Sequence, residues 1–152
     1  MNIRGHHLFC TYCFYGSGKK KAEDFFSVKN AIPELLKKLR QNPDMEINVK
    51  TDLDDVCEIC PLKRPDGCGR GSDAAAQNEK LSNWDRALLD TLELKEGDSI
   101  NARELEILIR KKVPDISKFC TNCSSASPSG WKEYQIGIRK GFWPDEGWMK
   151  EC

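Results

Sequence analysis

Residues 57–68 read CEICPLKRPDGC and place three cysteines close together. Cys57 and Cys60 have C-x2-C spacing, in which a tight turn orients both sulfur atoms toward one metal. Pro61 fixes its own φ angle and prevents a helix from continuing, which keeps the ligand loop open. Glycines on both sides of Cys68 permit the backbone turns around the third sulfur. The block predicts three ligands of one metal site, and the fold must bring the fourth ligand from a distant segment.

Two more C-x2-C pairs occur in the chain, at residues 10–13 and 120–123. Three such pairs in one short chain indicate metal binding more strongly than one pair would. Cys13 and Cys152 fit equally well as packing residues, because cysteine is often buried without any further function. A histidine could also complete the site. The cysteine candidates for the fourth ligand are Cys10, Cys120 and Cys123.

Iron–sulfur clusters and zinc both accept four thiolate ligands. Structural zinc sites usually take two ligand pairs, whereas three clustered cysteines and one remote cysteine are more typical of a cubane cluster. We therefore expect a [4Fe–4S] cluster, with zinc as the alternative. A four-thiolate site of either kind carries a net charge of about −2, which nearby cations would offset. The cations beside the block are Lys63, Arg64 and Arg70.

Length and charge limit the remaining classes of protein. The chain has 152 residues, which fits a single metal-binding domain over residues 1–152. Its 24 Lys+Arg balance its 24 Asp+Glu, so composition does not suggest a nucleic-acid or membrane-surface binder. No apolar run is long enough for a signal sequence or a membrane span. We expect a cytoplasmic protein, in which clustered cysteines bind metal or carry out redox chemistry rather than form disulfides.

The N-terminal half predicts both helix and strand. A short strand is expected near Asn2. Apolar residues recur at steps of three and four over residues 23–40, which predicts a helix that Pro33 kinks or splits. Apolar and polar residues alternate over residues 45–50, which is typical of a half-buried strand. The fold class is therefore α+β, mainly helical with a small sheet, in which cysteine-bearing loops gather around the metal site.

The C-terminal half predicts two further helices and an extension. The first helix covers residues 72–92 with Ser72 as its N-cap, and the second covers residues 102–112 with Asn101 as its N-cap. A loop of small residues is expected before residue 131. The aromatic side chains of residues 131–152 are expected to pack on the domain as a C-terminal extension.

His6 and His7 are the only histidines of the chain and precede Cys10 by a few residues. Adjacent side chains point to opposite faces of a strand and diverge by roughly 100° on a helix. We therefore expect at most one of the two to face a given site. There it would bind the metal or transfer a proton beside it, and the alternative is a packed or capping residue. The aspartates within residues 52–55 are expected to cap a turn before Cys57.

Several segments resemble a known family, the bacterial and archaeal domain of unknown function 1284. Residues 4–10, RGHHLFC, resemble the R-x-H-H-L-L-C opening of that family. This opening is the most specific of the similar segments, which together extend over most of the chain. The others, in the same order as in the family, are residues 54–61 with 67–68, residues 84–89 with their D-R pair, and residues 120–123.

The resemblance implies an iron–sulfur binding protein whose reaction and substrate are undefined. Members of that family carry a further cysteine soon after the second C-x2-C pair, whereas residues 124–131 of this chain contain none. This departure argues against a second, independent cluster at Cys120 and Cys123. It favours one shared site, or one complete site and one partial site.

The first functional hypothesis is an iron–sulfur protein that acts in electron transfer, or in redox or sulfur chemistry at its cluster, with a redox protein as partner. A structural zinc-binding adaptor module and a thiol redox or sulfur-carrier protein are the alternatives. Bound metal would add folding free energy, because it would join the N-terminal, middle and C-terminal segments. Neither a nucleic-acid nor a membrane partner is expected, and the sequence leaves the oligomeric state open.

Overall fold

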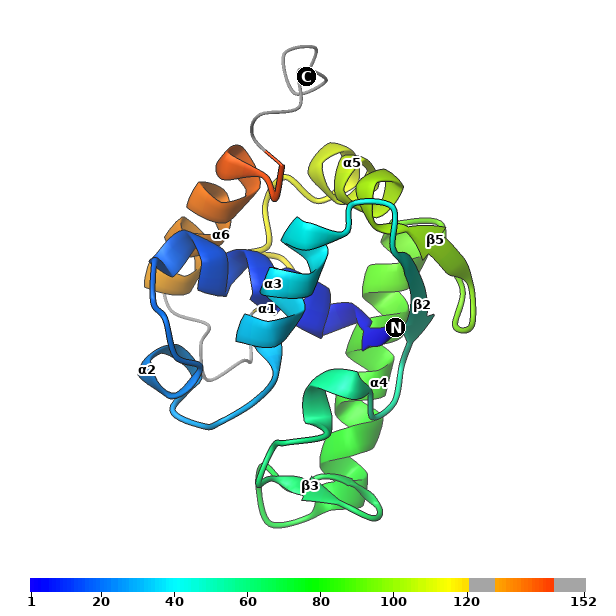
Figure 1. The fold of residues 1–152 in the computed structure, drawn as a ribbon. Helices are drawn as coiled ribbons and strands as arrows, with labels where there is room; N and C mark the ends of the chain where they lie inside the picture. Colours follow the sequence, from blue (N-terminus) through cyan, green and yellow to red (C-terminus); the bar gives the residue numbers. More distant parts are fainter. Residues whose placement is uncertain (121–127, 144–152) are drawn as a thin grey trace.

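The computed structural model describes residues 1–120 and 128–143, and it is mainly helical with a small sheet (Figure 1). The helices are α1 (Gly5–Ser17), α2 (Glu23–Phe26), α3 (Ile32–Gln41), α4 (Ala74–Thr91), α5 (Ala102–Lys112) and α6 (Pro128–Lys140). The strands are β1 (Asn2–Arg4), β2 (Glu46–Lys50), β3 (Lys63–Arg64), β4 (Gly67–Cys68) and β5 (Ser99–Asn101). The expected α+β class is confirmed.

The three-stranded sheet has the order β1-β2-β5. Strand β1 runs parallel to β2, with Arg4 opposite Lys50, and β5 runs antiparallel to β2. Because parallel strands end at the same edge of a sheet, the residues that follow β1 lie beside those that follow β2. The start of α1 is therefore next to residues 51–55, although about fifty residues of chain separate them.

The predicted elements of the N-terminal half are confirmed. Strand β2 buries Ile47 and Val49 and exposes Glu46, as the alternating pattern predicted. The helical pattern of residues 23–40 is split into α2 and α3. Pro33 lies in the first turn of α3, where the N–H group that proline lacks would have no partner within the helix.

The C-terminal half differs from its prediction in several respects, among them β5 and α6, which the sequence pattern did not predict. Helix α4 is capped by Asp73 rather than Ser72, since the Asp73 carboxylate accepts a hydrogen bond from the Ala76 N–H at 2.9 Å. Asn101 caps α5 as predicted. The expected loop before residue 131 is shorter, because α6 already begins at Pro128, and proline favours the first turn of a helix.

The aromatic C-terminal extension packs on the rest of the chain as far as it is described. Helix α6 lies against α1 (Figure 1). Tyr134, Phe142 and Trp143 are buried, and the Tyr134 hydroxyl donates a hydrogen bond to the Val113 carbonyl at 2.7 Å. The remainder of the extension, residues 144–152, lies outside the described residues. No helix in the described ranges has both the length and the apolar character needed to cross a bilayer.

Two glycines let α1 and α6 cross with their backbones in contact. A Cβ atom on Gly137 would overlap the carbonyl oxygen of Tyr12, and one on Gly16 would overlap the carbonyl oxygen of Glu133. Neither obstacle is a flexible side chain, so the helices themselves would have to move apart. The glycines therefore set the distance between the two helices.

Gly137→Ala is expected to lower the free energy of unfolding by about 1–3 kcal/mol, as overpacking does. Helix propensity alone would raise the free energy of unfolding by about 1 kcal/mol, so the sign of the measured change tells whether the two helices are in close contact at Gly137. Guanidinium unfolding measures the effect. Arg139→Ala, at an exposed position of the same helix, is the control and should change stability by less than about 0.5 kcal/mol. A stabilised Gly137→Ala variant would contradict the close crossing.

Glu106 is a buried acid beneath the C-terminal segment. Its side chain is 1% exposed, and Oε1 accepts a hydrogen bond from the Phe142 N–H at 2.8 Å. Burial raises the pKa of Glu106 above its ordinary value, and the Phe142 hydrogen bond and nearby arginines offset this only in part. Such a carboxyl group stabilises the fold at low pH, and this contribution is lost as pH rises through its folded-state pKa.

Glu106→Gln is expected to remove this pH-dependent loss, because an amide does not ionise. The stability of the variant relative to the original protein should increase as pH rises from the ordinary glutamate pKa of 4.5 through the raised pKa of Glu106. Urea unfolding across this range measures it, with Glu104→Gln, an exposed acid on the same helix, as the control. Parallel pH profiles for Glu106→Gln and the original protein would contradict the assignment.

Candidate functional site

A cavity of about 550 Å³ lies between the start of α1, the block of residues 57–68 and α4. Its lining includes both histidines of the chain. It also includes four of the cysteines predicted to bind metal, which are Cys10, Cys57, Cys60 and Cys68. The structure therefore brings the three clustered cysteines together with one remote cysteine at a single cavity.

Helix α1 supplies three of the lining side chains. Cys10 follows His7 by three residues and His6 by four, and side chains at these two spacings lie on one face of a helix. Both histidines border the same cavity, and their ring centroids are 4.3 Å apart. The expectation that at most one of them faces a given site is wrong. Their shared spacing to Cys10 on a helix was the signal that could have indicated this.

The block of residues 57–68 forms two successive turns. Cys60 N–H donates to the Cys57 carbonyl and Lys63 N–H donates to the Cys60 carbonyl, both at 3.0 Å. Strands β3 and β4 then form a small hairpin in which Cys68 lies opposite Lys63. Gly67, with φ of 136°, packs so closely on Asn78 of α4 that a Cβ atom there would overlap it. This contact holds the hairpin against the first turns of α4.

The predicted cations have different environments. Arg70 lines the cavity. Lys63 pairs with Glu58 at 2.6 Å, and Arg64 donates to the carbonyls of Pro61 and Lys63. Neither Lys63 nor Arg64 is part of the described lining. The hydrogen bond with Glu58 and the negative charge of Glu58 raise the pKa of Lys63. Charge compensation by these residues stays a prediction.

The remaining cysteines divide into two groups. Cys120 is partly buried against the hydrophobic core, and the described cavity lining includes its neighbours Lys118 and Phe119 but not Cys120 itself. Cys13 is buried in the core on α1. Cys123 and Cys152 lie outside the described residues.

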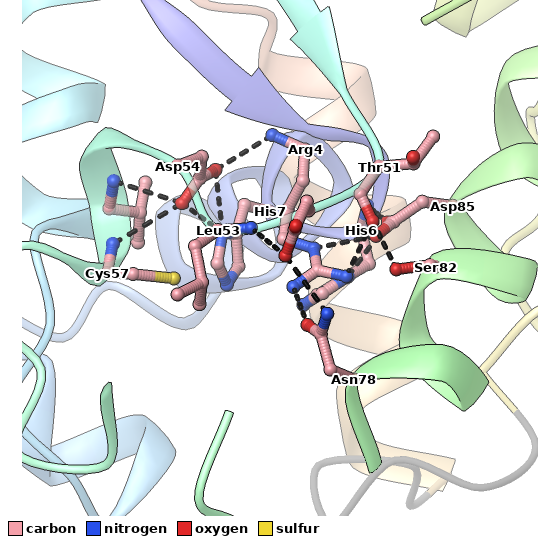
Figure 2. A network of polar contacts seen from close by, with 12 residues as sticks. Arg4, His6, His7, Thr51, Leu53, Asp54, Cys57, Asn78, Ser82 and Asp85 are labelled. Atoms are coloured by element: carbon pink, nitrogen blue, oxygen red, sulfur yellow. Dashed lines mark hydrogen bonds and ion pairs between the residues drawn. The ribbon is translucent and has the colours of Figure 1, made fainter. Parts of the chain in front are cut away.

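Each histidine is held by a buried carboxylate, as Figure 2 shows. His7 Nδ1 lies 2.9 Å and 3.0 Å from the two carboxylate oxygens of Asp54, and His6 Nδ1 lies 2.8 Å from Asp85 Oδ1. A carboxylate only accepts hydrogen bonds, so each ring carries its proton on Nδ1. This arrangement leaves the Nε2 lone pair of each ring available on the opposite edge.

Arg4 connects the two carboxylate–histidine pairs (Figure 2). Its backbone N–H donates to Asp54 Oδ2 at 2.7 Å, and its Nε donates to Asp85 Oδ2 at 2.6 Å. The rest of the guanidinium group donates to the Thr51 carbonyl and to Asn78 Oδ1, at 3.0 Å and 3.3 Å. The side chain is 1% exposed, so this charge is fully enclosed by its partners.

Asp54 has two roles in this arrangement. It is the predicted N-cap of a short 3-10 turn, η1 (Asp55–Cys57), in which its carboxylate accepts from the N–H groups of Val56 and Cys57. It also orients His7, which the sequence did not indicate. Arg4 and Asp85 likewise carry no local signal of a functional role, apart from their position within the segments that resemble the family.

The chain matches the model of a protein family described as a protein of unknown function, DUF1284, over residues 22–128. The chain belongs to this family. The matched range covers more than two thirds of the chain and includes the cysteines at 57, 60 and 68. Helix α1 of this family member, which carries His6, His7 and Cys10, precedes the matched range. No curated protein and no solved structure matches the chain.

The electrostatics of this DUF1284 chain favour ionised aspartates and a protonated thiol. Burial opposes ionisation of Asp54, but the charge of His7 and the hydrogen bonds that the carboxylate accepts lower its pKa to about 2. The pKa of Asp85 is also lowered, because the interactions with His6 and Arg4 outweigh burial. Burial and the nearby Asp54 charge raise the pKa of the Cys57 thiol to about 12. A bound cation would therefore have to displace a proton from Cys57.

One group of side chains in the described residues has the geometry of a metal-binding group. The ligand atoms of His7, Asp54 and Cys57 all lie within 4.8 Å of one another. The three residues follow the parallel strands β1 and β2, which explains why they meet. This protein of unknown function thus has a candidate metal-binding group at the edge of its cysteine-lined cavity.

Proposed function

We propose that this protein binds an iron–sulfur cluster of the [4Fe–4S] type, with Cys10, Cys57, Cys60 and Cys68 as its ligands. One observation carries the proposal: these four cysteines, from α1 and from the block of residues 57–68, line one cavity. The arrangement of three clustered ligands and one remote ligand matches the expectation for a cubane cluster. Cys10 is favoured as the remote ligand because it borders the cavity, whereas Cys120 is not part of the described lining.

The surroundings of the four cysteines fit the charge of such a cluster. A four-thiolate cluster carries a net negative charge of about −2, which nearby carboxylates would oppose. No carboxylate side chain lines the cavity within residues 1–120 and 128–143, and Arg70 contributes a positive charge. The Asp54 carboxylate lies within 4.8 Å of the Cys57 sulfur, where its hydrogen bonds with His7 and with the Arg4 N–H offset its charge in part. Val56 and Leu62 add apolar lining, which limits the access of water.

The cluster would supply one-electron transfer. His6 and His7 would lie beside it, with their rings fixed by Asp85 and Asp54 and with Nε2 available for a hydrogen bond or a proton. We propose a role in electron transfer with a redox protein partner, or in redox or sulfur chemistry within this cavity. Cys57 itself does not fit a thiol redox role, because reactive cysteines have lowered pKa values and the pKa of Cys57 is raised.

A single zinc ion is the second candidate, and the His7–Asp54–Cys57 group favours it. However, Asp54 already accepts hydrogen bonds from the backbone N–H groups of Arg4, Val56 and Cys57 and from His7 Nδ1. A zinc ion bound there would have to replace several of these bonds. It would also leave the convergence of the other three cysteines on the cavity without a role.

Metal and sulfide analysis of anaerobically purified protein tests the proposal. We expect a brown protein with about four iron and four acid-labile sulfide per chain, as a [4Fe–4S] cluster requires. Removal of the metal by a chelator should lower the unfolding temperature, since the ligands come from distant segments. A colourless protein with one zinc ion per chain and no sulfide would overturn the proposal in favour of the second candidate.

A further inference from the structure

The cavity is larger than four cysteines and a closed metal site require. A structural four-thiolate site is closed by its own ligands. The volume here, about 550 Å³, falls instead in the range of roughly 300–1,000 Å³ that small-molecule pockets occupy. The cavity therefore has room for a second molecule beside the cysteines.

Part of the cavity lining is apolar and partly aromatic. It includes Phe26, Ile32, Leu81 and Trp84, which come from α2, α3 and α4. The Trp84 ring stacks on the His6 ring with a centroid distance of 5.2 Å and an interplanar angle of 5°. These side chains can pack against an apolar or aromatic ligand body, which is the usual lining of a small-molecule site.

The charged lining of the cavity is entirely positive among the residues that the structure describes. Arg70, Lys80 and Lys118 line it, whereas no aspartate or glutamate does. Lys80 belongs to α4 and Lys118 to the segment after α5, and both side chains are exposed. Neither lysine takes part in an ion pair within the described part of the chain. Arg70 lies two residues after Cys68, so it is the cation nearest in sequence to the proposed cluster ligands.

Polar side chains also line the cavity, among them His6, His7, Asn30 and Gln77. The Nδ1 atoms of His6 and His7 are held by Asp85 and Asp54, and neither Nε2 takes part in a hydrogen bond to residues 1–120 or 128–143. A small number of fixed polar groups in an otherwise apolar pocket is what orients a ligand.

We infer that this cavity binds a small organic anion with an apolar body, an aryl or branched alkyl carboxylate. Its carboxylate pairs with Lys80 and Lys118, and its body packs against Trp84 and the neighbouring apolar side chains. The role of the bound ligand rests on the proposed function, because the ligand would lie beside the cluster. Binding itself rests on the shape and charge of the cavity.

The test uses isothermal titration calorimetry on the purified chain, with 4-phenylbutyrate and the neutral 4-phenyl-1-butanol as probes of the same body. We expect 4-phenylbutyrate to bind at one site with a Kd about tenfold or more below that of the alcohol. The double variant Lys80→Gln, Lys118→Gln should reduce this difference to less than about twofold. Lys95→Gln, Lys111→Gln removes the same charge at exposed positions outside the cavity and should preserve the difference. Trp84→Leu should weaken both probes.

Equal Kd values for the two probes, no saturable binding of either, or an unchanged difference in the Lys80→Gln, Lys118→Gln variant would each overturn the inference. Iron and sulfide are measured on the same samples. A cluster-containing protein that does not bind the acid overturns the inference alone. A protein without iron and sulfide that binds the acid as expected overturns the proposed function and supports the anion site.

Discussion

Cys10→Ser is expected to abolish retention of the iron–sulfur cluster, whereas Cys120→Ser is expected to leave the iron and sulfide content unchanged. Both cysteines are partly buried and both are remote in sequence from residues 57–68, but Cys10 lines the cavity and Cys120 is not part of its described lining. A serine hydroxyl is a much weaker ligand than a thiolate for iron. Iron, acid-labile sulfide and visible absorption of anaerobically purified variants measure the effect.

Cys13→Ser is the matched control for Cys10→Ser. Cys13 lies one turn further along α1 and is buried in the core, so its substitution should cost stability without loss of iron. Cys68→Ser should behave like Cys10→Ser. Loss of the cluster from Cys120→Ser together with its retention in Cys10→Ser would contradict the ligand set and identify Cys120 as the remote ligand.

Arg4→Leu is expected to lower the free energy of unfolding by about 3–5 kcal/mol, which is the usual cost of breaking a buried ion pair. The substitution leaves the buried Asp85 carboxylate without its guanidinium partner, and the Thr51 carbonyl and Asn78 lose a donor. Guanidinium unfolding measures the change. Because Asp85 also holds His6, the variant should in addition disturb the ring orientation on the cavity side.

Arg86→Leu is the matched control on α4. Its guanidinium is exposed, and among the described residues it donates only to Asn83 on the same helix, so the change should be within about 0.5 kcal/mol. Arg4→Lys keeps the charge but cannot reproduce the forked set of donors, and it should fall between the two. A loss below about 1 kcal/mol for Arg4→Leu would mean that the network around Arg4 contributes little to stability.

The sequence predicted the elements whose cause is local. Pro33 lies in the first turn of α3, where its missing N–H costs no helical hydrogen bond, and residues 46–50 form a strand because apolar residues alternate there. The C-x2-C spacing at 57–60 and the glycine beside Cys68 likewise act within a few residues. Helix α6 was missed because Gly130 and Gly137 weaken the helical pattern, and the role of Gly137 becomes visible only when α1 lies against it.

The candidate site was predicted in part. Three clustered cysteines could be recognised from their spacing alone, whereas the choice among Cys10, Cys120 and Cys123 stayed open. Both histidines border the cavity because helix α1 begins directly after β1, and the sequence pattern did not predict a helix over residues 5–17. Had the helix been assigned from Gly5, the spacing of His6 and His7 to Cys10 would have predicted one face.

The sequence alone determined a mainly helical α+β fold and a local group of three cysteine ligands, because helix periodicity, strand alternation and turn chemistry act over a few residues. Tertiary structure decided which distant groups join them. Arg4 meets Asp54 and Asp85 across 50 and 81 residues of chain, and His6 meets Asp85 across 79. These contacts depend on the parallel pairing of β1 with β2 and on the packing of α4 against α1, which no local pattern encodes.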